Sequence, residues 1–281
     1  MRARRAVGLQ LSGGRPARQL PPPVMAPEIS IVVPLFNEAP NVLPLTRRIL
    51  EAFGDRRDLE LLLVNDGSND ETWERILEAG RADARVRGVR HERSCGQSAA
   101  LWTGFMHSRA PVVATLDGDL QNDPADLPRM LGMLDQCDMV CGVRTRRADN
   151  RLRRISSAIA RKARRLALGV DFADTGCNLR VFKRWVLTLV PPFNGLHRFM
   201  PILAHNSGAV VRETPVLHHP RAAGVSKYGV WNRLGRGIYD LIMVRLYMRR
   251  QFRKVTTTEP GLGVKEPPSE RSQALSSKAG H

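Results

Sequence analysis

The sequence predicts an α/β protein with a mostly parallel sheet flanked by helices. Short apolar runs alternate with stretches of helical periodicity, many of the runs are rich in β-branched residues, and the runs are bounded by turn-forming residues. Strands that alternate with helices of about a dozen residues are typical of parallel sheets covered on both faces. The chain has 281 residues, 42% of them hydrophobic, which is enough for a core of this kind.

The expected elements follow one another from residue 29 onward. Strands are predicted at 29–35, 59–66, 86–91, 111–117 and 138–144, where apolar residues run together. Helices are predicted at 41–53, 68–80, 96–108 and 124–136, where apolar residues recur at helical spacing. In the second of these helices, Ser68, Asn69 and Asp70 are the expected N-terminal caps. Beyond residue 170 we expect a turn, strand and helix at 171–187, a helix at 197–208 and an edge strand within 210–220.

The formal net charge of +17 is concentrated in two segments. Residues 144–165 contain ten basic residues and one acid, and residues 221–254 contain nine basic residues and one acid. Such segments indicate an anionic partner, which could be nucleic acid, a phosphorylated substrate or a membrane surface. The sequence has no uncharged apolar run of 18 residues, so it predicts no membrane span.

Composition divides the chain into four parts. Residues 1–26 are expected to form a disordered basic arm, and residues 255–281 a disordered tail. Between them we expect one folded domain at 27–228 and an amphipathic, membrane-associated helix at 229–254. The four cysteines are scattered without metal-binding spacing, which indicates free thiols in a reducing compartment.

Acidic residues follow three of the predicted strands. Glu38 follows the first strand, Asp66 the second, and Asp117 and Asp119 the fourth. The carboxyl ends of parallel strands meet at one edge of a sheet, which is where ligands bind. Each acid alone is typical of a turn or a helix cap, but capping does not explain four of them converging on one cleft.

The segment "TLDGDLQN" (115–122) predicts a divalent-cation site. If the chain stays extended past Leu116, the side chains of Asp117, Asp119 and Gln121 point to the same side. Three hard oxygen ligands suit Mg²⁺ or Mn²⁺ that is completed by substrate phosphates and water. Gly118 allows another group to approach the backbone closely.

Six motifs in order resemble those of family-2 inverting glycosyltransferases with the GT-A fold. They are "IVVPLFNE", "LLVNDGSND", "GQSAAL", "DGDLQNDP", "GVRTRR" and "PRAAGVSKYGVWNR", and the resemblance covers roughly 29–250. More narrowly, the chain resembles the polyprenyl-phosphate sugar transferases, such as dolichol-phosphate mannose synthase and the bacterial enzymes that load undecaprenyl phosphate. The resemblance implies that 27–228 is catalytic. It also implies a hexosyltransferase that moves a sugar from a UDP- or GDP-sugar to a polyprenyl phosphate in cell-envelope glycan or glycolipid assembly.

The resemblance also implies roles for individual residues. The implied nucleotide-sugar-binding residues are Pro34, Phe36, Glu38, Val64, Asp66, Asp117, Gly118, Asp119, Arg221 and Lys227. The implied catalytic residues are Asp117, Asp119 and Arg144, with Mg²⁺ or Mn²⁺ on Asp119 and Gln121. The expected contacts of the acceptor phosphate are Arg144, Arg151, Arg154 and Arg198. The family often has Tyr in place of Phe36 and a second Asp in place of Asn65, so the base of the donor stays open.

The basic segment after residue 144 suits a phosphate acceptor better than a neutral sugar. A sugar hydroxyl needs a general base, whereas a phosphate monoester already carries about −1.5 to −2 charges at neutral pH and needs cations to hold it. An inverting glycosyltransferase that acts on a carbohydrate hydroxyl is the first alternative. A basic nucleic-acid-binding protein is the second, but the basic segments lack interleaved aromatic residues and any recognisable binding motif. We therefore expect no nucleic-acid partner.

Two basic amphipathic stretches predict contact with an anionic membrane surface. The first lies within 144–165, where a helix packed on the sheet with a solvated basic face is the alternative. In the second, at 230–254, the residues expected on one side are Trp231, Leu234, Ile238, Leu241 and Ile242, and Tyr239 and Tyr247 are aromatics favoured at bilayer interfaces. The expected location is the cytoplasmic, inner face of the membrane, as a peripheral protein or with an integral membrane partner.

Overall fold

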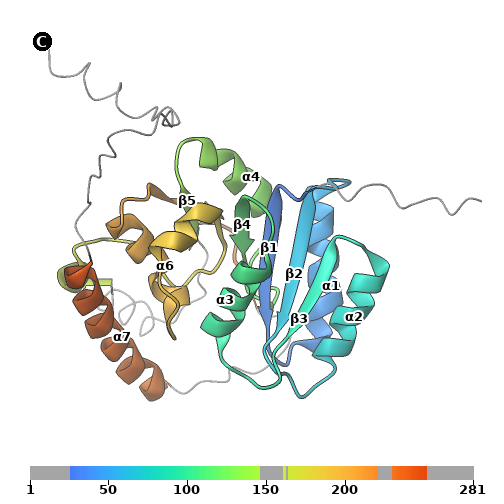
Figure 1. Cartoon of the computed structure of the whole chain (residues 1–281), viewed down its shortest axis with the longest axis horizontal. Helices are drawn as coiled ribbons and strands as arrows, with labels where there is room; N and C mark the ends of the chain where they lie inside the picture. The colour runs from blue at the N-terminus through green and yellow to red at the C-terminus, as the bar shows by residue number, and fades with distance from the viewer. Residues whose placement is uncertain (1–25, 146–160, 163, 221–229, 252–281) are drawn as a thin grey trace, which may run out of the picture.

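The computed structural model describes residues 26–145, 161–162, 164–220 and 230–251 (Figure 1). The predictions for Arg151, Arg154, Arg221 and Lys227 lie outside the described residues. The expected tail and nearly all of the expected N-terminal arm lie outside them as well.

A seven-stranded sheet forms the centre of the molecule, with the strand order β3-β2-β1-β4-β6-β5-β7. The strands are β1 Ile29–Leu35, β2 Leu59–Asn65, β3 Val86–Arg90, β4 Val112–Thr115, β5 Met139–Arg144, β6 Arg180–Lys183 and β7 Val211–Val216. The strand β6 is antiparallel to its neighbours β4 and β5, and all other adjacent pairs are parallel. The prediction of a mostly parallel sheet is therefore confirmed, and β7 lies at its edge as expected.

Helices cover both faces of the sheet (Figure 1). They are α1 Ala39–Phe53, α2 Thr72–Ala82, α3 Gln97–His107, α4 Asp126–Gly132, α6 Leu196–Asn206 and α7 Val230–Arg250, with 3₁₀ turns at Met133–Asp135 and Arg184–Leu189. Apolar residues of α1, α2 and α4 share one core with the sheet, and those of α3 and α6 share a second core on the opposite face. Because β1, β2 and β4 are buried on both faces, they consist of near-continuous apolar runs.

The loops that follow β1 and β2 are tied together by side chains that the sequence suggested were helix caps. Ser68 accepts a hydrogen bond from the backbone N–H of Asn37 at 2.9 Å, and Asp70 accepts one from that of Ala39 at 3.2 Å. Helix α2 therefore begins at Thr72 rather than at residue 68. The prediction was wrong about the start of the helix because these short polar side chains bind the neighbouring loop. Asp70 also accepts a hydrogen bond from the backbone N–H of Thr72 at 3.0 Å, so it does contact the later start of α2.

Helix α7 does not keep all of its predicted apolar stripe on one side. The side chains of Leu241, Val244 and Met248 pack into the second core, whereas that of Ile242 is 53% exposed. Leu241 and Ile242 therefore do not share a face, which corrects part of the predicted stripe. The side chains of Trp231, Leu234 and Ile238 are not among those that the structure describes. Among the helices described, none is long and apolar enough to cross a membrane.

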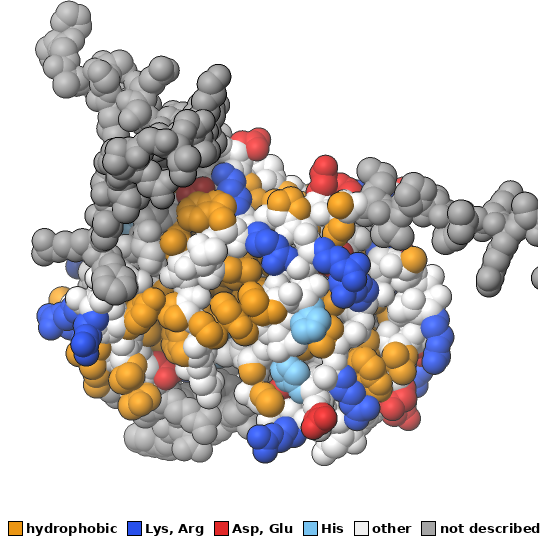
Figure 2. Space-filling view, in the orientation of Figure 1, with side chains coloured by type: hydrophobic (Ala, Val, Ile, Leu, Met, Phe, Trp, Pro, Cys, Tyr) orange, Lys and Arg blue, Asp and Glu red, His pale blue; other side chains and the backbone are white. Residues whose placement is uncertain are grey.

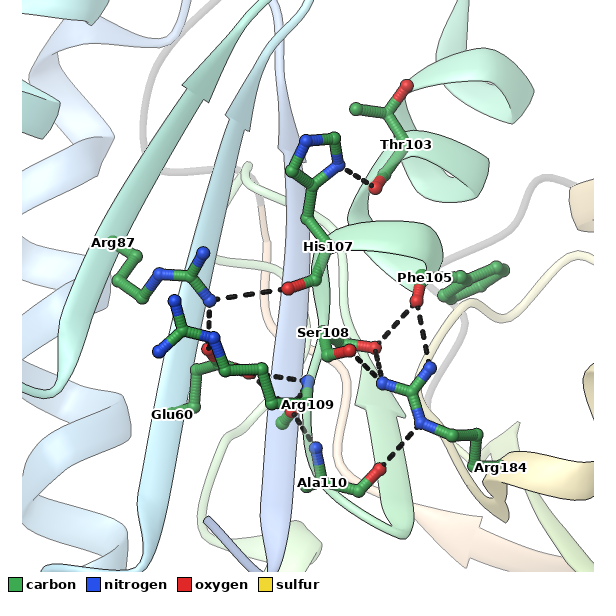
Figure 3. A network of polar contacts seen from close by, with 10 residues as sticks. Glu60, Arg87, Thr103, Phe105, His107, Ser108, Arg109, Ala110 and Arg184 are labelled. Carbon is green, nitrogen blue, oxygen red and sulfur yellow. Dashed lines mark hydrogen bonds and ion pairs between the residues drawn. The ribbon is translucent and has the colours of Figure 1, made fainter. Parts of the chain in front are cut away.

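A polar network anchors the C-terminal end of α3 to the starts of β1 and β2 (Figure 3). The buried Glu60 carboxylate accepts hydrogen bonds from the Ser30 hydroxyl at 2.6 Å and the Arg109 backbone N–H at 3.0 Å, and it pairs with Arg87. The Arg184 guanidinium donates to backbone carbonyls at the end of α3 and just beyond it. The network thereby satisfies groups that a helix end leaves unpaired, and it fixes α3 against the sheet.

Candidate active site

The loops that follow the carboxyl ends of β1 and β2 are held together by hydrogen bonds. Asn37 has a positive φ of 52°, and its side-chain oxygen accepts a hydrogen bond from the backbone N–H of Asn69 at 3.0 Å. The predicted residues Pro34, Phe36 and Glu38 lie here and are half-buried. The side chain of Val64, in contrast, is fully buried in the core against α3, so only its backbone belongs to this edge.

Asp66 is buried and holds the turn that leads into α3. Its carboxylate accepts hydrogen bonds from the backbone N–H groups of Cys95 and Gly96, both at 2.8 Å, and from the Ser94 hydroxyl at 2.9 Å. The ring of His91 lies 2.8 Å from the same carboxylate. Asp66, His91 and Cys95 thus come together, but hydrogen bonds occupy the carboxylate from several sides. The interaction with the 91–96 turn was not anticipated from sequence.

Asp117 sits just past the end of β4, where two amides converge on it. Gln97, the first residue of α3, and Asn178, just before β6, each donate a hydrogen bond from the side-chain N–H to Oδ1 of Asp117 at 2.8 Å. Gly118 has no side chain, and this allows β1 to lie close to it. A Cβ at this position would lie 2.4 Å from Cδ2 of Leu35, which is too close. The close neighbour that the glycine admits is thus β1 itself.

The chain does not stay extended through the acidic motif. The strand β4 ends at Thr115, residues 118–120 form a turn, and Leu120 has a positive φ of 61°. Alternation along an extended strand therefore does not align the side chains of Asp117, Asp119 and Gln121, and this prediction was wrong. Asp119 and Gln121 are placed by the turn instead: Asp119 accepts a hydrogen bond from the Gln121 backbone N–H at 3.2 Å, and the Gln121 side-chain amide faces the His219 carbonyl at 3.4 Å.

Asp119 destabilises the charged form of its neighbour Asp117. Burial of the carboxyl group, followed by repulsion from Asp119, raises the pKa of Asp117 to about 6, although Asn178, Arg144 and Arg180 act in the opposite direction. A divalent cation would remove this repulsion, and the carboxylate and amide oxygens at 117–121 are the hard donors that Mg²⁺ and Mn²⁺ prefer. The residues present therefore fit such an ion.

Cations line the side of the site next to β5 and β6. Arg144 forms a two-pronged pair with Asp174, with Nε to Oδ2 at 2.7 Å and Nη2 to Oδ1 at 2.8 Å. Arg180 is 2% exposed and donates from Nη2 to the Thr175 carbonyl at 3.0 Å. Arg198, in the first turn of α6, lies 3.9 Å from Asp240 of α7. The site thus combines an acidic pair with fixed positive charges.

A neutral histidine joins α3 to α6 beside this site. Nδ1 of His197 lies 2.7 Å from the Ser98 hydroxyl, which also accepts a hydrogen bond from the Gly195 backbone N–H at 3.0 Å. Burial, with help from Arg198 and Arg180, lowers the pKa of His197 to about 3. At neutral pH this imidazole is therefore uncharged and serves as a hydrogen-bonding link.

Residues 30–187 match glycosyl transferase family 2. The chain belongs to this family. It is therefore a glycosyltransferase, and its mixed sheet flanked by helices is the GT-A-like fold that the motifs predicted. A solved structure of glucosyl-3-phosphoglycerate synthase from Mycobacterium tuberculosis superimposes with a TM-score of 0.61 at 19% identity, covering 78% of each chain.

Relatives of this family-2 glycosyltransferase share its sequence over most of its length. It is 38% identical over 247 residues to the dodecaprenyl-phosphate galacturonate synthase of Rhizobium johnstonii, covering 85% of this chain and 72% of the relative. It is 36% identical over 218 residues to the undecaprenyl-phosphate 4-deoxy-4-formamido-L-arabinose transferase of Shewanella sediminis, covering 76% of this chain and 65% of the relative. The chain thus spans about two thirds of the length of these relatives.

Proposed function

We propose that this glycosyltransferase moves a sugar from a nucleotide-sugar donor to a polyprenyl phosphate. The observation that carries the proposal is the identity of 36–38% to a dodecaprenyl-phosphate galacturonate synthase and an undecaprenyl-phosphate sugar transferase, because the names of both relatives contain a polyprenyl phosphate and a sugar. We further propose that the reaction serves cell-envelope assembly at the inner face of the cytoplasmic membrane.

The donor would lie across the ends of β1, β2 and β4. Pro34, Phe36, Glu38 and the Asp66 region would hold the nucleoside, with Asp117 and Gly118 beside the diphosphate. Asp119 and Gln121 would hold Mg²⁺ or Mn²⁺, which neutralises charge on the leaving diphosphate when bound. The Mycobacterium tuberculosis neighbour was solved in complex with Mn²⁺, UDP and phosphoglyceric acid, and this likeness in fold supports the proposed placement.

The acceptor would enter from the side of Arg144 and Arg198. Arg151 and Arg154, which follow β5 in sequence, are proposed to complete this cationic surface. A phosphate oxygen of the acceptor forms the new bond to the anomeric carbon as the bond from that carbon to the nucleoside diphosphate breaks. No proton has to be removed from the attacking oxygen, because the phosphate monoester is already ionised at neutral pH.

Helix α7 is proposed to rest on the anionic membrane surface. Five of its apolar side chains are 41–65% exposed: Tyr239, Ile242, Met243, Leu246 and Tyr247. Apolar side chains gather over α7 and the neighbouring α6 in Figure 2. Basic residues Arg249 and Arg250 end the helix, so its surface combines the two features of interfacial helices. An integral membrane partner would be compatible with the same surface.

The proposed donor and metal can be tested with purified protein. We would incubate it with short-chain polyprenyl phosphate and a panel of radiolabelled UDP- and GDP-sugars, with Mn²⁺ or Mg²⁺, or with EDTA. We expect one donor to yield an organic-extractable, mild-acid-labile product that EDTA abolishes. The absence of such a product with every donor and either metal would contradict the proposal.

The raised pKa of Asp117 predicts an acidic limit to activity. Asp117 must be ionised to balance cationic groups in the site, so kcat/KM should fall as the pH drops through about 6. Because a bound divalent cation favours the carboxylate, raising the Mn²⁺ concentration should move this limit to lower pH. The measurement is kcat/KM from pH 5 to 8 at low and high Mn²⁺. A profile that stays flat down to pH 5 at low Mn²⁺ would contradict this assignment.

A further inference from the structure

A pocket of about 250 Å³ lies away from the candidate active site, between the end of α6, residues 166–168 and the C-terminal half of α7. The residues that line it are Leu166, Ala167, Leu168, Asn206, Arg245, Met248 and Arg249. Among these described residues none is acidic, and none belongs to the donor or acceptor residues assigned above. The pocket is therefore separate from the proposed donor and acceptor sites.

Hydrogen bonds fix the walls of this pocket. Nη1 of Arg245 donates to the Ala167 carbonyl at 3.0 Å, which holds the guanidinium against the 164–168 helical turn. The Asn206 side chain donates to Gln251 at 2.8 Å, and Gln251 in turn donates to the Ser207 hydroxyl at 3.1 Å. The ends of α6 and α7 are thus tied together around the opening, so the pocket is pre-formed.

The lining combines two guanidinium groups with apolar surface. Arg245 and Arg249 lie one turn apart on α7, while Leu168 and Met248 belong to the second core. Beside the opening, the side chain of Leu166 is 73% exposed. Planar guanidinium groups bind phosphate through paired N–H donors, and exposed apolar residues next to them favour a ligand that carries hydrocarbon.

We propose that this pocket binds the phosphate headgroup of an anionic phospholipid. Its acyl chains would lie over Leu166 and the exposed apolar side chains of α7, such as Ile242 and Leu246, which are 53% and 49% exposed. The proposal deepens the membrane contact suggested above and rests on it for its biological purpose. A lipid is the expected ligand because positive charge and exposed apolar surface occur together here.

Such a lipid would also orient the catalytic cleft. Helix α7 contacts the start of α6 through Asp240, whose Oδ2 would lie 2.9 Å from a Cβ added at Gly195. The start of α6 carries His197 and Arg198, on the acceptor side of the site. A headgroup bound at the C-terminal half of α7 would therefore hold the acceptor side of the cleft near the membrane from which a lipid acceptor comes.

The test uses the full chain and a phospholipid too short to form bilayers. Dihexanoyl phosphatidylglycerol, kept below its critical micelle concentration, would be titrated by calorimetry into the wild type and the variants Arg249→Gln and Arg250→Gln. We expect saturable binding that Arg249→Gln weakens about fivefold or more, the effect of one lost cationic contact at a lipid headgroup. The matched control Arg250→Gln removes the same charge from the next residue, which does not line the pocket, and should change binding by less than about twofold.

Several outcomes would overturn the proposal. They are the absence of saturable binding, equal losses in the two variants, binding of glycerol phosphate as tight as that of the lipid, and displacement of the lipid by an acidic peptide. Equal thermal midpoints of the variants would exclude misfolding as the cause. Because the titration needs no sugar transfer, its result is separate from the catalytic proposal. Arg249→Gln should keep full turnover with a water-soluble, short-chain acceptor.

Discussion

Replacing Asp119 by Asn should lower the rate of sugar transfer by about two to three orders of magnitude. The change keeps the shape of the side chain and its acceptor for the Gln121 backbone N–H, which now lies 3.2 Å from Oδ1. It removes the negative charge that we propose holds the divalent cation. The fold should stay intact, because the residue is only partly buried and follows the end of β4.

The matched control for this variant is Asp135→Asn. Asp135 is exposed in the 3₁₀ turn after α4, and the same chemical change there should leave the transfer rate within about twofold of the wild type. Initial rates would be measured over a range of Mn²⁺ concentrations. Wild-type activity in Asp119→Asn, with unchanged dependence on Mn²⁺, would remove the proposed metal role of this residue.

Replacing Glu60 by Ala should lower the free energy of unfolding by about 2–4 kcal/mol. The carboxylate is 5% exposed and accepts hydrogen bonds from Ser30 and the Arg109 backbone while pairing with Arg87 (Figure 3). Its removal leaves these donors in a buried setting without their partner. Urea unfolding followed by circular dichroism would measure the loss.

An exposed glutamate provides the control for this stability prediction. Glu51, in α1, pairs with Arg47 at 3.9 Å, but its side chain is 67% exposed. Glu51→Ala should therefore change the free energy of unfolding by less than about 0.5 kcal/mol, as is usual for surface ion pairs. If Glu60→Ala were no more destabilising than this control, the network at the start of β1 and β2 would not be the anchor described here.

Most strands and helices could be predicted from sequence because the apolar runs are buried on both faces of the sheet. The run at 29–35 became β1 and the run at 59–66 became β2, with ends that differ by at most one residue. The direction of β6 could not be predicted, since an apolar pattern does not show whether a strand runs parallel or antiparallel to its neighbours. The start of α2 was misplaced because Ser68 and Asp70 bind the loop after β1, and Asp70 contacts the helix only at Thr72.

The candidate site was only partly predictable. The position of Asp117 and Asp119 after a strand correctly predicted that they lie at the edge where β1 and β2 end. The turn at 118–120, however, depends on Leu120 adopting a positive φ that leucine rarely takes. The hydrogen bond from Gln97 to Asp117 joins residues on different elements, and the only sequence signal for it was a polar residue at the start of the predicted helix at 96–108.

The choice of acceptor tests the proposed function most directly. With the donor identified in the panel, purified protein would be given a polyprenyl phosphate, the polyprenol of the same chain length, or a free sugar at equal concentrations. The account predicts labelled, mild-acid-labile lipid with the phosphate alone. Comparable transfer to the alcohol or to the free sugar would contradict it, because the enzyme would then act on hydroxyl groups.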